Sequence, residues 1–196
     1  MTSQLTAAEH ALLWNDFRSG SADAFAKLYD LFAADLYRYG YNLIRNRQLV
    51  EDCLHELFLH LHERRARLGA TDNIRFYLYR AMRRRLLDTV GRFNKLASDE
   101  YLFEDAEFQI QPYECLLVEE QLIDQQKQLL VVELNRLPKR QKEILYLVYM
   151  KGLTYSQAAE VMNITLKSVY NTVNVALTTL RALVRVSFRQ RGVLSM

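Results

Sequence analysis

The stretch from residue 137 to residue 185 constrains the fold most, because its breaks and caps divide it into helices joined by tight turns. Leu137-Pro138 ends one helix and starts another, since proline lacks an N–H and suits the first helical turn. After a glycine-containing turn, Thr154 is positioned to cap a short helix. Asn163, which tolerates left-handed backbone, marks the next turn, and Thr165 caps a last long helix. The pattern predicts a helix-turn-helix, whose second helix enters the major groove of DNA.

The last helix is predicted to have an apolar face and a polar face. Val169 and Val173 lie on the apolar side, whereas Asn171 and Asn174 fall on the other, at about 100° per residue. Asparagine can pair bidentately with adenine, and residues 161–196 contain no acid that would repel DNA. The alternative is an ordinary amphipathic helix with a solvated polar face. The candidates for reading base edges are Lys167, Ser168, Tyr170, Asn171 and Asn174, and those for phosphate contacts are Lys142, Thr154 and Tyr155.

The composition predicts an all-α chain in two domains. Of the 196 residues, 50% are hydrophobic, and only 2 are prolines and 6 are glycines. Residues 64–95 are strongly basic, whereas residues 96–126 contain many acids and no Lys or Arg. We therefore expect two small helical domains joined by an acidic linker. The front domain covers residues 1–94, the linker 95–114, and the helix-turn-helix domain 115–196.

Apolar spacing predicts four helices in the front domain, at Thr2–Ser19, Ala24–Arg45, Gln48–Arg67 and Ile74–Val90. On the third of these, Leu59 points away from the apolar stripe and lies beside acidic side chains. An outward leucine beside carboxylates is typical of a protein-contact patch, and a merely solvated face is the alternative. The patch consists of Asp52, His55, Glu56 and Leu59.

The fourth helix combines aromatic rings with cations. Separated DNA strands are held by such a mixture, because ring faces stack on unpaired bases and cations bind the backbone. The alternative is a basic helix whose arginines serve solubility. The candidate residues are Tyr77, Arg80, Arg83 and Arg84.

Other functional classes find little support in the sequence. The two cysteines, Cys53 and Cys115, form no CxxC, so we expect neither a disulfide framework nor a zinc site. The histidines His55 and His60 are five apart, whereas the HExxH zinc motif needs a spacing of four. Asp52, Glu56 and His60 share a helical face and remain a weak metal-binding alternative.

We also expect no catalytic site, no metal, no cofactor and no small-molecule substrate, because the sequence contains no glycine-rich phosphate loop and no supported Ser/His/Asp arrangement. No signal peptide opens the chain, and no apolar run is long enough to cross a bilayer. The expected location is therefore cytoplasmic, without membrane insertion.

Three motifs together resemble a bacterial RNA polymerase sigma factor of the extracytoplasmic-function class. Leu137-Pro138 and the run Gly152-Leu-Thr-Tyr-Ser-Gln-Ala-Ala-Glu-Val-Met-Asn-Ile-Thr look like that family's promoter-binding helix-turn-helix. Val50-Glu-Asp-Cys-Leu-His-Glu-Leu-Phe is similar to its polymerase-binding helix, and Tyr77-Leu-Tyr-Arg is similar to its promoter-melting helix. The resemblance covers nearly the whole chain and implies a factor that binds core RNA polymerase and promoter DNA.

The resemblance also assigns roles. It implies that the patch on the third helix grips the polymerase clamp, and that the loop Thr71, Asp72 and Asn73 contributes to a pocket for a base flipped from the non-template strand. It further implies an inhibitory anti-sigma partner. This chain departs from the family's usual residues at His55, Tyr77 and Arg84, where Gln, Trp and Asn are frequent, and at Thr172 and Val175, where Arg is frequent.

Two rival functions remain open from the sequence. A stand-alone helix-turn-helix regulator would share the last motif but would not depend on core polymerase. A helical adaptor protein would need neither DNA nor polymerase. Co-purification with core polymerase separates both from a sigma factor.

Overall fold

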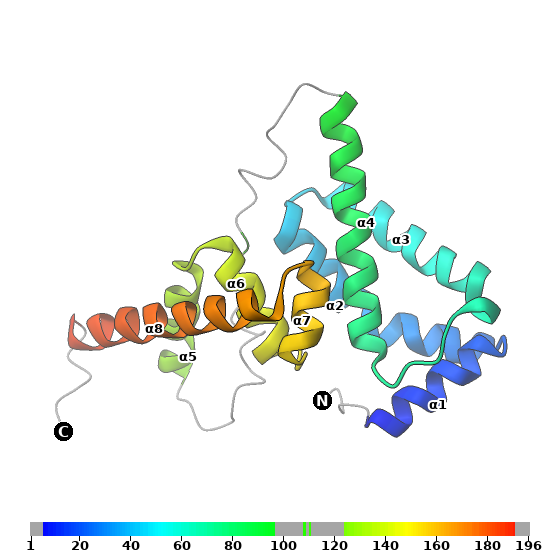
Figure 1. Ribbon diagram of the computed structural model, residues 1–196, viewed down its shortest axis with the longest axis horizontal. Coiled ribbons are helices and arrows are strands. Elements are labelled where there is room, and N and C mark those ends of the chain that lie inside the picture. Colours follow the sequence, from blue (N-terminus) through cyan, green and yellow to red (C-terminus); the bar gives the residue numbers. More distant parts are fainter. Residues whose placement is uncertain (1–5, 97–107, 109, 111–123, 191–196) are drawn as a thin grey trace. The chain divides into compact units, whose positions relative to one another are not determined.

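The computed structural model describes residues 6–96, 108, 110 and 124–190. The predicted all-α fold is confirmed, since every regular element in these residues is helical. The chain divides into two compact units, Met1–Ala106 and Glu107–Met196 (Figure 1).

Over residues 6–96, the first unit has four α-helices and a short 3₁₀ turn. They are α1 (Ala7–Arg18), α2 (Ala22–Ile44), α3 (Arg47–Arg64), η1 (Arg65–Arg67) and α4 (Ile74–Leu96). The sequence predicted each of these helices, but α4 continues past Gly91, where the prediction ended it. Residues 2–5 of the predicted first helix lie outside the described part of the chain, and Thr6 is the cap of α1, which begins at Ala7.

Local sequence sets where these helices begin. Thr6 and Glu9 form a reciprocal capping box at α1, and the hydroxyl of Ser21 accepts the N–H of Ala24 at α2. The side chain of Asn46 accepts the N–H of Leu49 at 3.0 Å and starts α3. Each cap satisfies a backbone donor that the helix leaves unpaired.

The core of the first unit lies where α2, α3 and α4 cross. A Cβ at Gly40 of α2 would lie 2.9 Å from Cγ1 of Val50 and 3.0 Å from Cε of Met82. Both distances are shorter than normal van der Waals contacts. The absence of a side chain at Gly40 therefore lets the three helices approach closely.

A pair of glycine substitutions tests this packing. Gly40→Ala is expected to lower the free energy of unfolding of the first unit by about 1–3 kcal/mol, because the methyl group overpacks the crossing. Gly91→Ala, in α4, is expected to raise it by about 0.5–1 kcal/mol, since nothing lies within 4 Å of its Cβ and alanine favours helix. Trp14 is the single tryptophan and is buried in this unit, so its fluorescence during urea unfolding measures both effects. A stabilised Gly40→Ala variant would contradict the prediction.

The second unit contains α5 (Asp124–Asn135), α6 (Lys139–Leu145), a π-helical turn η4 (Tyr146–Met150), α7 (Tyr155–Met162) and α8 (Leu166–Gln190). The long helix α8 packs on α5, α6 and α7 (Figure 1). Pro138 precedes α6 and Thr154 caps α7, as the sequence predicted. The π-helical turn was not predicted.

A buried carboxylate joins α5 to the far part of α8. Glu133 is 1% exposed, and its Oε1 accepts the hydroxyl of Ser187 at 2.7 Å. Arg136 forms an ion pair with the same carboxylate at 2.9 Å. These contacts satisfy a charge that would otherwise be costly to bury.

The predicted acidic linker, residues 95–114, lies mostly outside the described part of the chain. Within it, Phe108 and Ile110 are described and are buried. Both belong to the second unit, which begins at Glu107, ahead of the predicted start of the helix-turn-helix domain at residue 115. Among the described helices, none has the length and apolar character that crossing a membrane requires.

Candidate nucleic-acid and protein interfaces

The helix-turn-helix of the second unit consists of α7 and α8 with a turn between them. Thr154 and Gln157 form a capping box at the start of α7. Asn163 ends α7 with φ 53°, in the left-handed region that asparagine tolerates. The hydroxyl of Thr165 then accepts the N–H of Ser168 at 3.1 Å and caps α8. The chain therefore turns at the residues that the sequence indicated.

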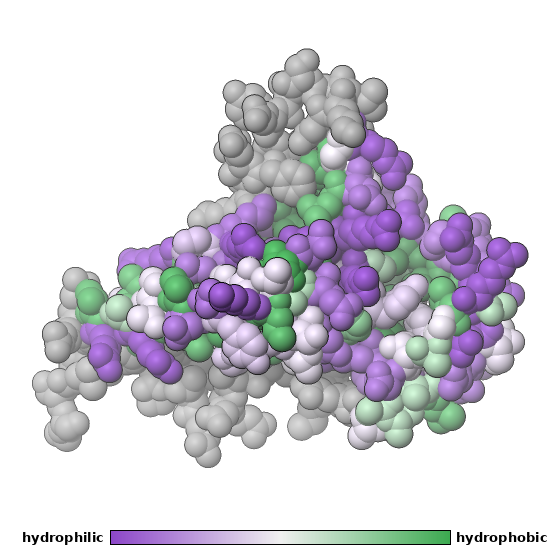
Figure 2. Space-filling model, viewed as in Figure 1, coloured by the Kyte–Doolittle hydropathy of each residue, from purple (hydrophilic) through white to green (hydrophobic). Residues whose placement is uncertain are grey.

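The two faces of α8 match the prediction. Val169, Val173 and Ala176 are at most 2% exposed and hold the helix on its unit. Lys167, Tyr170, Asn171 and Asn174 are exposed on the other face. Ser168 is half-buried, and its hydroxyl lies 2.9 Å from that of Thr165, so its first role is structural. Figure 2 shows hydrophilic and apolar side chains intermixed over the visible face of this helix.

Lys142 does not lie on the surface, and the structure corrects its assignment as a phosphate contact. It is 1% exposed, and its ammonium donates to the carbonyl of Asn135 at 3.1 Å. Lys151, a second lysine of this unit, is 6% exposed, with its Nζ 5.0 Å from the ring centre of Tyr146. Both cations are engaged inside the unit and are not available to DNA in this conformation.

Truncating Lys142 should therefore behave as a core substitution. Lys142→Ala is expected to lower the free energy of unfolding of the second unit by about 2–5 kcal/mol, because it removes a packed stem and leaves the Asn135 carbonyl unpaired. Far-UV circular dichroism during urea unfolding measures this loss. The exposed Lys167→Ala serves as the control, with little change in stability. A Lys142→Ala variant of normal stability would contradict the burial.

A group of three tyrosines lies at the start of the helix-turn-helix. The rings of Tyr155 and Tyr170 meet edge to face at 4.9 Å, and the hydroxyls of Tyr149 and Tyr155 lie 3.3 Å apart. That hydrogen bond, together with burial, raises the pKa of Tyr155. Tyr149 and Tyr170 are 48% and 56% exposed. The sequence prediction included Tyr155 and Tyr170 but missed Tyr149, which the unpredicted π-helical turn brings beside Tyr155.

The basic face of the first unit lies along α4. Arg80 and Arg84 are exposed, whereas Arg83 is half-buried. Arg84 lies 3.7 Å from Asp88, one turn further along the helix, with both side chains largely exposed. Figure 2 shows hydrophilic side chains over much of the visible face of this helix. Arg80 and Arg84 therefore lie on the surface of α4, whereas Arg83 is partly covered.

Tyr77 is less accessible than the sequence suggested. Its ring is half-buried and lies 5.1 Å from the ring of Trp14, and burial raises the pKa of its hydroxyl. The indole N–H of Trp14 donates to the carbonyl of Gly69 at 2.8 Å. Trp14 therefore contacts the loop before α4 and also covers part of the Tyr77 ring.

The loop itself is held by its own polar side chains. The N–H of Asn73 donates to the hydroxyl of Thr71 at 3.1 Å. Asn73 Oδ1 accepts the N–H of Phe76 at 3.0 Å and so caps α4. Of the three loop candidates, Asp72 is the exposed one. Thr71 and Asn73 therefore set the shape of the loop.

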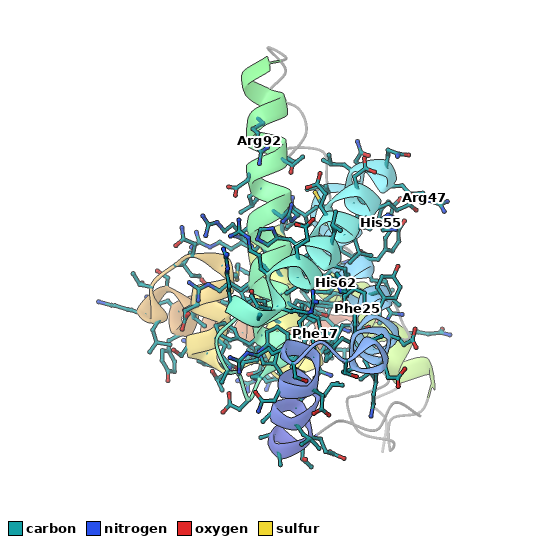
Figure 3. All side chains as sticks on the ribbon, turned by 90° about the vertical axis from the view of Figure 1, so that its right-hand side faces the viewer. Phe17, Phe25, Arg47, His55, His62 and Arg92 are labelled. Atoms are coloured by element: carbon teal, nitrogen blue, oxygen red, sulfur yellow. The ribbon has the colours of Figure 1, made fainter. Side chains whose placement is uncertain are left out.

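The predicted contact patch is on the surface of α3. Asp52, His55, Glu56 and Leu59 are all exposed, and Leu59 is 58% exposed. Glu56 is not isolated, because its Oε2 accepts from Arg85 of α4 at 2.6 Å. Figure 3 places His55 and His62 along the same helix, with His62 close to Phe25 of α2. In the described residues, no cluster of three His, Cys, Asp or Glu side chains is suited to a metal ion.

Aromatic side chains that the sequence prediction did not single out extend this surface toward α2. Tyr29 is 38% exposed and its ring lies 4.8 Å from that of Phe58, which precedes Leu59 in α3. The ring of Phe25 lies 5.1 Å from that of His62. The four-residue spacing of Phe25 and Tyr29 is a signal that could have identified this extension.

Comparisons with known proteins match both units. The family models for Sigma-70 region 2 and Sigma-70 region 4 match residues 28–95 and 127–180. The ECF RNA polymerase sigma factor SigM of Bacillus subtilis is 26% identical over 148 residues, which cover 71% of this chain and 82% of SigM.

Two solved structures have a similar fold. The sigma factor RpoE of Bartonella quintana, solved in complex with the anti-sigma factor NepR, gives a TM-score of 0.56 at 17% identity, covering 83% of this chain and 97% of RpoE. CnrH, solved in complex with the cytosolic domain of CnrY, gives a TM-score of 0.54 at 16% identity, covering 90% and 97%.

Proposed function

We infer that this chain, which belongs to the sigma-70 family, is a sigma factor that binds core RNA polymerase and directs it to promoters. The observation that carries the inference is the combination, in one chain, of region 2 with an exposed basic helix and region 4 with an exposed polar recognition helix. A stand-alone regulator would need only the second. The chemistry of RNA synthesis belongs to the polymerase, and this chain supplies recognition.

Each surface then has a separate task. The patch of Asp52, His55, Glu56 and Leu59 binds the polymerase through one exposed apolar side chain surrounded by polar ones. The arginines of α4 hold the backbone of separated strands, and the loop at Asp72 lies next to them. The exposed face of α8 reads base edges in the major groove.

We further propose that an anti-sigma protein controls access to these surfaces. The two solved structures with a similar fold were determined as complexes, one of them with a named anti-sigma factor. The exposed apolar side chains Leu59 and Tyr29 offer such a partner an anchoring point on the first unit. The proposed place of action is the cytoplasm, where polymerase and promoters are found.

The decisive experiment is run-off transcription with purified core RNA polymerase, this chain and genomic DNA fragments. We expect discrete transcripts that depend on the chain, together with a stable complex in gel filtration. Failure of the chain both to associate with core polymerase and to start any transcript would overturn the assignment. DNA binding without polymerase would instead favour the stand-alone regulator.

A further inference from the structure

Phe108 and Ile110 form an anchor that attaches the end of the connecting segment to the second unit. Phe108 is 0% exposed and Ile110 is 1% exposed. The ring of Phe108 meets that of Tyr146 edge to face, with ring centres 5.4 Å apart. Two apolar side chains from an acidic stretch are thus removed from water, which is the main favourable term in such docking.

The side chain of Asn135 holds the backbone of this anchor at two points. Its Oδ1 accepts the N–H of Ile110 at 2.8 Å, and its Nδ2 donates to the carbonyl of Ile110 at 2.9 Å. One amide therefore satisfies both backbone groups of a buried residue, as a neighbouring β-strand would. This pairing is specific to an asparagine or a close analogue at residue 135.

The anchor rests on a rigid support. Asn135 is the last residue of α5, and its own carbonyl accepts the ammonium of the buried Lys142 from α6. Tyr146, which covers Phe108, is itself 0% exposed. The attachment point is therefore built from three successive elements, α5, α6 and η4, and the groups from α6 and η4 are buried.

We propose that this anchor limits the spacing between the two promoter elements that the chain can engage at once, an inference that rests on the proposed function. A chain spans at most about 3.6 Å per residue. From Leu96 at the end of α4 to Phe108, the connection reaches at most about 43 Å. Without the anchor, the connection runs to Asp124 at the start of α5 and reaches at most about 100 Å.

The difference is large on the scale of DNA. At about 3.4 Å per base pair, the anchored connection corresponds to about 13 base pairs and the released one to about 30. The anchor thus makes Phe108, Ile110 and Asn135 specificity-determining residues for promoter spacing. They contact no DNA in this role and act through the number of residues that connect the two units.

The test uses the full chain with core polymerase and a promoter identified by run-off transcription. The spacing between its two elements is varied one base pair at a time, up to four either way. Phe108→Ala and Asn135→Ala release the anchor, whereas a six-residue Gly/Ser insertion between residues 100 and 101 lengthens the connection ahead of it. Gln128→Ala removes an exposed amide from the same helix as Asn135 and serves as the matched control.

We expect the wild type and Gln128→Ala to lose at least tenfold in transcription when the spacer is three base pairs too long. The two anchor variants and the insertion should reduce that loss severalfold, while transcription from the optimal promoter stays similar. Circular dichroism checks that Phe108→Ala and Asn135→Ala are folded. If either is not, the insertion decides, because it leaves the anchor residues unchanged.

Two results would overturn the proposal. One is an unchanged spacer profile in folded anchor variants that still initiate at the optimal promoter. The other is an unchanged profile in the insertion variant. Failure of the proposed function is a different result, because the wild type itself would then fail to bind core polymerase or to initiate at any spacing.

Discussion

Replacing Asn171 and Asn174 together by alanine is expected to lower promoter-specific transcription by about thirtyfold or more. Both side chains are exposed on the recognition helix, and the residues behind them are buried, so the substitutions should leave the fold intact. A bidentate contact from asparagine to a base contributes roughly 1–3 kcal/mol of discrimination, and about 1.4 kcal/mol corresponds to a tenfold change. Run-off transcription on the cognate promoter measures the effect.

The affinity of this double variant for core polymerase provides the internal control and should be unchanged. Gln128→Ala, which removes an exposed amide from α5, should affect neither transcription nor polymerase binding. An equal loss of transcription and polymerase binding in the double variant would argue against base reading by α8. It would indicate that the two asparagines contribute to the fold or to the protein interface.

Leu59→Arg is expected to weaken binding to core polymerase by about tenfold to a hundredfold. Leu59 is 58% exposed on α3, and burying such a side chain in an interface contributes about 1.5–3 kcal/mol. The chain offers a close control in Leu12→Arg, because Leu12 is 66% exposed in α1 of the same unit and lies outside the patch. Fluorescence anisotropy of labelled chain titrated with core polymerase separates the two variants.

Glu56→Arg should also weaken polymerase binding, but it is a less clean probe than Leu59→Arg. It places a second guanidinium opposite Arg85, so its effect includes repulsion within the unit. Equal affinities of the Leu59→Arg and Leu12→Arg variants for polymerase would remove the basis for a contact patch on α3.

The sequence predicted the helices well because their boundaries are set by local chemistry. Ser21, Thr154 and Thr165 each accept a backbone N–H within three residues, so the capping pattern is complete in a short window. The exposed face of α8 was predicted for a similar reason, since helical periodicity assigns one side to the core.

The features that the sequence did not predict depend on contacts between side chains of different helices or segments. The sequence predicts Lys142 to be a surface cation, yet its ammonium donates to the carbonyl of Asn135, at the end of the preceding helix. Phe108 and Ile110 lie in an acidic stretch without a period, and their contacts come from later helices: Tyr146 packs on Phe108, and the Asn135 side chain pairs with the backbone of Ile110. Tyr77 has a suitable position in its helix, but Trp14, far away in sequence, covers part of its ring.

The ion pair between Glu56 and Arg85 connects the exposed patch on α3 to the basic helix α4. A protein that bound the Glu56 carboxylate would compete with Arg85 for it and so leave the Arg85 guanidinium with one partner fewer. Because binding free energies are linked, DNA held by Arg85 would strengthen the grip of that protein by the same factor. Binding to the polymerase and binding to the DNA duplex would then strengthen each other through this one ion pair.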